Sequence, residues 1–130
     1  MEKISEKKRF SIIKRVKSAN HAFHGLEVLL KTTHNFWGHL FFAALVVYLG
    51  VAIGISQIEW LIIVLLIGFV LVIEAINTAI EIDIDLTSPT YHPYAKDTKD
   101  VAAAAVALSV LTACIVGLII FLPKILELYM

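Results

Sequence analysis

Four side chains that could do chemistry recur at helical spacing in the middle of the chain: Glu74, Asn77, Glu81 and Asp85. At about 100° per residue they fall within about 80° of one another, so a helix carries them as one polar stripe, with Asp83 on its opposite side. A buried glutamate binds its proton more tightly, which suits a general base that works near neutral pH. Carboxylate and amide oxygens suit Mg²⁺, which accepts them together with substrate phosphates.

A second polar group precedes the last apolar run, where Lys96, Lys99, Asp100 and Ala103 share one helix face by the same spacing. A lysine there could neutralise the acidic stripe or bind phosphate as a point charge. The sequence has no GxxxxGK[ST] loop and no GxGxxG motif, so a nucleotide would need another arrangement. The alternative interpretation is a polar cluster that satisfies its own charges and fixes the helix register.

Two histidines, His34 and His39, precede these groups in the chain and are five residues apart. That is a poor spacing for two metal ligands on one helix, and we interpret both as interfacial or packing residues.

The elements that must position these residues are transmembrane helices. The chain has 130 residues, 59% of them hydrophobic, and a mean hydropathy of +0.85, which is too apolar for one small soluble core. Three spans are predicted, over 36–55, 60–81 and 99–122. The apolar part of the second covers only roughly 21 Å, so its helix must continue through Glu74, which places this carboxylate at membrane depth near one edge.

The segment between the second and third spans, 82–98, is predicted to be a polar loop. Pro89 and Pro93 bar a regular helix through its middle. Asp97 or Thr98 is the expected N-cap of the third span, and Pro123 its expected end.

An amphipathic helix is predicted over 4–31, because apolar residues recur there at steps of three and four. Seven of the eleven basic residues fall in the first 17 positions: Lys3, Lys7, Lys8, Arg9, Lys14, Arg15 and Lys17. This pattern favours a helix in the headgroup layer, with packing on the protein itself as the alternative. The positive-inside rule places the N-terminus and the 82–98 loop in the cytoplasm. The expected fold is an all-α integral membrane protein of one domain, with three transmembrane helices and an N-terminal interfacial helix.

At the stripe the sequence resembles the small bacterial membrane lipid kinases, the diacylglycerol kinase and undecaprenol kinase family. The resemblance extends from about Gly25 to Pro123. It rests on the E-x-x-N-x-x-x-E-x-x-x-D pattern from Glu74 to Asp85, on Tyr91-His92-Pro93 and on Lys99-Asp100. The residues that follow the stripe, from Tyr91-His92-Pro93 onward, are more similar to the undecaprenol kinases than to the diacylglycerol kinases.

The resemblance implies a homotrimer in the bacterial cytoplasmic membrane that phosphorylates a lipid alcohol from ATP and Mg²⁺, with no nucleic-acid partner. Its active site would lie at the cytoplasmic interface between adjacent subunits. Glu74 matches the base that takes the proton from the lipid hydroxyl, Glu81 matches a Mg²⁺ ligand, and Ala103 stands with Glu74 at the lipid substrate. The positions implied for nucleotide binding are Lys14, Asn77, Glu81, Asp85, Tyr91, His92, Lys99 and Asp100.

Three positions depart from the family pattern. Thr33 stands where relatives usually carry a metal-binding Glu, Trp37 where they often carry Arg, and Lys14 where Arg is usual. Loss of one carboxylate should weaken Mg²⁺ binding. A catalytically impaired relative that binds lipid or nucleotide is therefore the alternative function. A small channel or proton pathway along the acidic stripe is a third hypothesis.

Overall fold

The computed structural model describes residues 11–130 and is helical nearly throughout that range. The helices are α1 (Ile12–Thr32), α2 (His34–Ile53), α3 (Gln57–Thr87) and α4 (Pro93–Tyr129). Helices α2, α3 and α4 are each long and apolar enough to cross a membrane. The predicted fold class of one surface helix and three spans is thereby confirmed. Residues 4–10 of the predicted surface helix lie outside the described residues, as do the first four basic residues.

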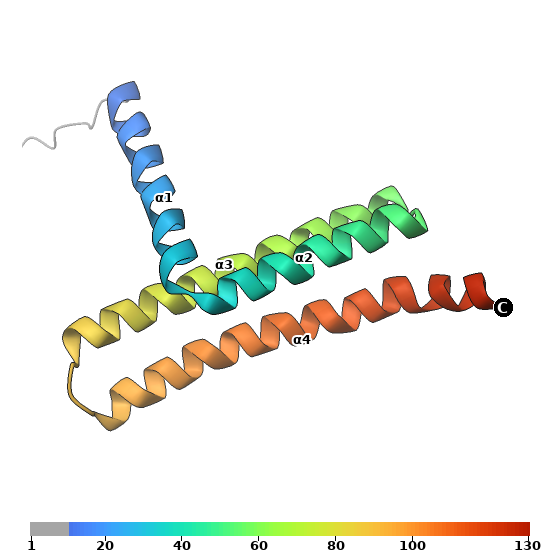
Figure 1. Cartoon of the computed structure of the whole chain (residues 1–130). Coiled ribbons are helices and arrows are strands. Elements are labelled where there is room, and N and C mark those ends of the chain that lie inside the picture. Colours follow the sequence, from blue (N-terminus) through green and yellow to red (C-terminus); the bar gives the residue numbers. More distant parts are fainter. Residues whose placement is uncertain (1–10) are drawn as a thin grey trace, which may run out of the picture.

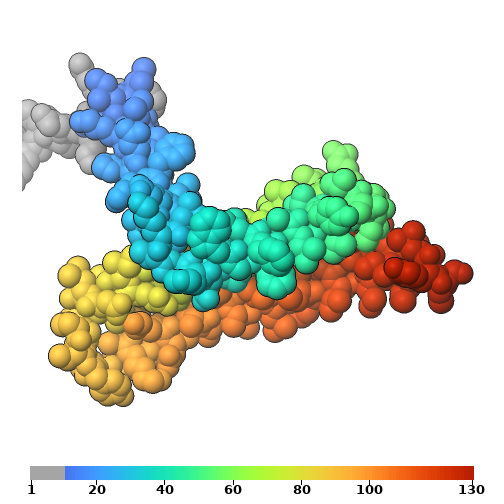
Figure 2. Space-filling model, viewed as in Figure 1, coloured from blue at the N-terminus to red at the C-terminus, as the bar shows by residue number. Residues whose placement is uncertain are grey.

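The three long helices run side by side, and α1 leaves them as a separate arm (Figure 1). Helix α3 packs against both α2 and α4. In the space-filling view α1 projects from the start of α2, with its first turns away from the other helices (Figure 2). A single non-helical residue, Thr33, joins α1 to α2, with φ −113° and ψ 101°.

The turn between α2 and α3 is specified by its own residues. Gly54 ends α2 with a φ of 77°, a left-handed conformation that glycine adopts without strain. Ser56 and Glu59 then form a capping box, in which each side chain accepts a hydrogen bond from the other's backbone N–H. Lys124 of α4 lies 3.3 Å from the Glu59 carboxylate, which ties α4 to this turn.

The apolar core lies at this same end of the bundle. Ile55, Ile63, Ile120 and Phe121 form a buried cluster, and we call this end the core end. Elsewhere the helices leave large apolar side chains uncovered; Leu65, for example, is 73% exposed. So much apolar surface is unusual for a soluble chain and suits helices surrounded by lipid.

The opposite end, which we call the polar end, differs from the prediction of a long loop over 82–98. Helix α3 continues to Thr87, and α4 already begins at Pro93, so only 88–92 connect them. The acidic stripe itself has helical spacing, and no helix breaker precedes Pro89. Pro93 opens α4 because a first helical residue needs no N–H partner.

Two predicted ends of the third span are also wrong. The N-cap of α4 is His92, whose ring Nδ1 accepts a hydrogen bond from the Tyr94 N–H at 3.2 Å; neither Asp97 nor Thr98 caps it. Pro123 lies inside α4, which runs on to Tyr129. Proline removes one backbone hydrogen bond, but the turn after it is retained by the Lys124–Glu59 ion pair and by the packing of Ile125 on the core.

Candidate active site

Glu74 is the most buried ionisable side chain among residues 11–130, with 1% of its surface exposed. Helix α2 covers it: the Nε2 atom of His39 lies 3.4 Å from the Glu74 Oε2 atom. Within the described residues, both Glu74 carboxylate oxygens and His39 Nε2 lack a partner with hydrogen-bond geometry. The carboxylate therefore faces protein instead of lipid, and its oxygens remain available to a ligand.

The rest of the acidic stripe follows along α3 toward the polar end. Asn77 is 7% exposed, Glu81 is half-buried and Asp85 is exposed. The Asn77 side-chain Nδ2 donates a hydrogen bond to Glu81 Oε1 at 3.2 Å. Asp83 lies exposed outside this run. The stripe thus leads from a dehydrated carboxylate to a solvent-accessible one within three helical turns.

Helix α4 brings two lysines to the outer part of the stripe. Lys99 Nζ lies 2.8 Å from Asp85 Oδ1 across the two helices. Lys96 is bonded to Asp100 one turn further along its own helix. The expectation that a lysine of this segment neutralises the acidic stripe is met by Lys99.

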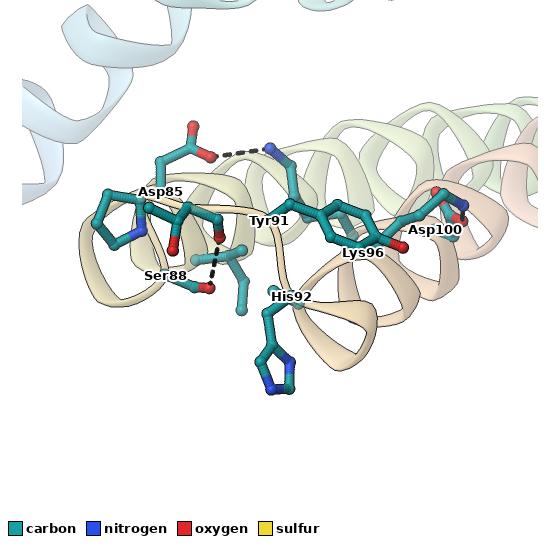
Figure 3. Close-up of a pocket in the computed structure, with 11 residues that line it drawn as sticks. Asp85, Ser88, Tyr91, His92, Lys96 and Asp100 are labelled. Atoms are coloured by element: carbon teal, nitrogen blue, oxygen red, sulfur yellow. Dashed lines mark hydrogen bonds and ion pairs between the residues drawn. The ribbon is translucent and has the colours of Figure 1, made fainter.

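These charged groups surround a hollow of about 360 Å³ beside the α3–α4 turn (Figure 3). We call it the polar pocket. Five of the eight positions implied for nucleotide binding line it: Asp85, Tyr91, His92, Lys99 and Asp100. Lys96, Ser88 and Thr90 complete its polar lining, so the pocket offers both ammonium groups and hydrogen-bonding groups to a phosphorylated ligand.

Lys14 and Ala103 are not brought to these groups within one chain. Lys14 lies exposed near the start of α1, on the arm that leaves the bundle. Ala103 is exposed on α4, whereas its neighbours Ala102 and Ala105 line a mostly apolar hollow of about 490 Å³ that Ile80 of α3 also borders.

Thr33, which stands at the expected second metal position, contacts α3 through Thr78. The two Oγ1 atoms are 3.1 Å apart. Thr78 donates its hydroxyl proton to the backbone carbonyl of Glu74 at 3.0 Å, so the Thr33 hydroxyl is the donor to Thr78. The position lies beside the acidic stripe, where it supplies a hydroxyl group in place of a carboxylate.

The residues present fit a magnesium ion that arrives on phosphate. No group of three His, Cys, Asp or Glu side chains within the described range could hold a metal ion by itself. Asn77 Oδ1 is buried without a hydrogen-bond partner there, and Glu81 adds a carboxylate beside it. An amide oxygen and one carboxylate are hard ligands, and Mg²⁺ typically takes the remainder from phosphates and water.

Sequence reasoning missed His39. The available signal was a polar side chain inside the otherwise apolar run of α2. Its spacing to His34 is poor for a metal pair, and its partner Glu74 lies on another helix, which no local spacing could reveal.

Comparison with known proteins identifies the family of the chain. The family described as prokaryotic diacylglycerol kinase matches residues 20–121. An undecaprenol kinase of Bacillus subtilis (strain 168) is 45% identical over 108 residues, which cover 83% of this chain and 88% of the relative. A diacylglycerol kinase of Synechocystis sp. is 35% identical over 112 residues, which cover 85% of this chain and 64% of the longer relative. The resemblance noted in the sequence is thus confirmed, and the chain belongs to the prokaryotic diacylglycerol kinase family, a family of lipid kinases.

Proposed function

We propose that this protein transfers the γ-phosphoryl group of ATP to the hydroxyl group of a membrane lipid alcohol, with Mg²⁺ and at the cytoplasmic membrane interface. The observation that carries the proposal is the buried Glu74 carboxylate, which begins a stripe that ends at the polar pocket. Undecaprenol is the proposed alcohol, because the relative named undecaprenol kinase shares more of this sequence than the one named diacylglycerol kinase.

The depth of Glu74 supports a lipid hydroxyl as its substrate. At 1.5 Å per residue Glu74 lies about 26 Å along α3 from Gln57, and a bilayer core is about 30 Å thick. If Gln57 stands at the outer boundary, Glu74 lies just inside the inner one. A lipid alcohol carries its hydroxyl group at that level, whereas ATP can approach only from the water beyond it.

The chemistry divides along the stripe. Glu74 accepts the hydroxyl proton as the lipid oxygen forms its bond to the γ-phosphorus and the bond to ADP breaks. Lys99 and the polar pocket hold the nucleotide, and Asn77 and Glu81 orient its inner phosphates. Glu81 and Asn77 oxygens would hold Mg²⁺, which would supply neutralisation of the phosphate charge. Phosphoryl transfer depends mainly on such positioning and charge neutralisation, for which these residues are the right types.

The proposed assembly is a homotrimer in the bacterial cytoplasmic membrane with its N-terminus in the cytoplasm. One feature supports subunit sharing: the α1 arm carries Lys14 away from its own site. In a trimer, Lys14 and Ala103 would serve the site of a neighbouring subunit.

A second candidate is a catalytically impaired relative that binds lipid or nucleotide. The contact of Thr33 with Thr78 favours it, because a hydroxyl group engaged there replaces a metal-binding carboxylate.

Both candidates are tested by one assay. The purified protein, in lipid-containing detergent micelles with Mg²⁺, is incubated with γ-labelled ATP and a panel of undecaprenol, diacylglycerol and a short-chain prenol. We expect undecaprenol to receive more labelled phosphate than any other lipid of the panel. Label in none of the lipids, with ATP binding retained, would favour the impaired relative.

A further inference from the structure

The contact between His39 and Glu74 has no part in the mechanism above. We propose that His39 is a positioning residue: its Nε2–H holds the Glu74 Oε2 atom, so that Oε1 is presented to the lipid hydroxyl. The inference rests on the proposed function and deepens it by assigning separate tasks to the two carboxylate oxygens.

The direction of the contact follows from the chemistry of the two groups. An ionised carboxylate only accepts hydrogen bonds, so a neutral imidazole that binds Glu74 through Nε2 must carry its proton on that atom. The 3.4 Å separation is longer than an ordinary N–H···O bond. Catalytic contacts are often long without substrate and shorten when it binds.

Burial makes a partner necessary. Glu74 is 1% exposed, and the His39 side chain is 18% exposed, so the imidazole and not bulk solvent lies beside the carboxylate. A buried ionised carboxylate requires a hydrogen-bond donor or an opposite charge. Within the described residues His39 is the ionisable side chain that lies at ion-pair distance from Glu74.

The two carboxylate oxygens differ in their relation to His39. Oε2 lies 3.4 Å from His39 Nε2, and neither oxygen has a partner with hydrogen-bond geometry among residues 11–130. A contact that served only to join α2 to α3 would be expected to satisfy these buried oxygens. With His39 beside Oε2, Oε1 is the oxygen left for a ligand's hydroxyl group.

The test compares two amides at position 39. In His39→Gln the side-chain nitrogen reaches approximately the place of Nε2, whereas in His39→Asn the same amide is one methylene shorter. We expect His39→Gln to stay within about threefold of wild-type kcat and His39→Asn to lose up to about 100-fold, with the KM for ATP unchanged in both. His34→Asn is the matched control, because His34 is exposed and lies about 140° around the same helix.

A second measurement does not depend on turnover. Dicyclohexylcarbodiimide reacts with protonated carboxyl groups in apolar surroundings, and its addition to Glu74 is followed by peptide mass spectrometry at pH 7. An imidazole that holds Oε2 shields this oxygen from the reagent, so His39→Asn should be labelled severalfold faster than wild type and His39→Gln should not.

The outcomes distinguish the two proposals. Equal kcat and equal labelling in the Gln and Asn variants would overturn the role of His39, even in an active kinase. A wild-type protein that phosphorylates no lipid alcohol, but shows the Asn-specific rise in labelling, would keep the His39–Glu74 contact and refute the proposed function.

Discussion

Lys99 Nζ of α4 lies 2.8 Å from Asp85 Oδ1 of α3, and this ion pair joins the two helices at the wall of the polar pocket. Asp85 is exposed and Lys99 is half-buried. Solvent screens such a pair, so it contributes little to stability. In the proposed function this pair places an ammonium group beside the pocket, where a phosphate would replace Asp85 as its partner.

Replacing Lys99 with Met should therefore weaken ATP binding and leave the fold intact. A hydrogen bond to a charged group lost from a binding site reduces affinity by about 10- to 100-fold. We expect the KM for ATP to rise by that factor, with the KM for the lipid unchanged. Lys31→Met is the control, because Lys31 pairs with Glu27 in solvent on α1. An unchanged KM for ATP would remove Lys99 from the nucleotide site.

Replacing Glu74 with Gln should abolish turnover. The amide keeps the size of the side chain but cannot accept the hydroxyl proton, and general-base catalysis contributes about 10²- to 10⁴-fold. Labelled phosphate transfer to undecaprenol measures the loss, and gel filtration checks the assembly. The matched control is Asp83→Asn, an exposed carboxylate outside the stripe, which should stay near wild type. Full activity of Glu74→Gln would refute the assignment of the base.

Replacing Thr33 with Glu should lower the Mg²⁺ concentration needed for half-maximal activity. The Thr33 hydroxyl lies 3.1 Å from Thr78, one turn from Glu74 on α3, so a carboxylate at this position adds a hard ligand beside the stripe. A magnesium titration of the initial rate measures the shift. Thr32→Glu adds the same charge one residue earlier, at an exposed position, and should leave the titration unchanged. If both variants lower the required Mg²⁺ concentration equally, the added negative charge attracts the ion at a distance and the position 33 carboxylate is not a ligand.

Replacing Gly50 with Ala should destabilise the core end. A Cβ atom on Gly50 would lie 2.8 Å from the Trp60 ring and 3.1 Å from Ile55 Cδ1. Overpacking of this kind typically costs about 1–3 kcal/mol. Thermal unfolding in detergent should show a lower midpoint. Gly68→Ala, whose added Cβ meets nothing within 4 Å, should leave the midpoint unchanged or raise it, because alanine is the better helix former.

The sequence predicted those parts of the molecule that depend on hydropathy and on spacing within one helix. The three spans follow from apolar runs, and the stripe from Glu74 to Asp85 follows from the helical period. The prediction of a loop over 82–98 is wrong at both ends, because Asp85 continues the helical period of Glu81 and α4 already begins at Pro93. Neither proline ends a helix, although Pro123 was the expected end of the third span. Pro93 is the first residue of α4, and Pro123 lies within the same helix.

Contacts between helices are the part that sequence could not supply. The pairing of His39 with Glu74 and of Thr33 with Thr78 depends on the relative rotation of two helices. A lysine near the acidic stripe was expected, but the choice of Asp85 as the partner of Lys99 depends on this rotation too. Taken alone, each of these side chains is explained by packing or solvation. A chemical role can be proposed only when its partner on the other helix is known.

The single-residue junction at Thr33 has a mechanical consequence. Helix α1 is 21 residues long, about 31 Å at 1.5 Å per residue, so a 10° rotation about Thr33 displaces its far end by about 5 Å. The same residue touches α3 beside Glu74 through Thr78. We therefore expect a change of side chain at position 33 that alters this contact to change the tilt of α1 as well, with the largest displacement at its far end.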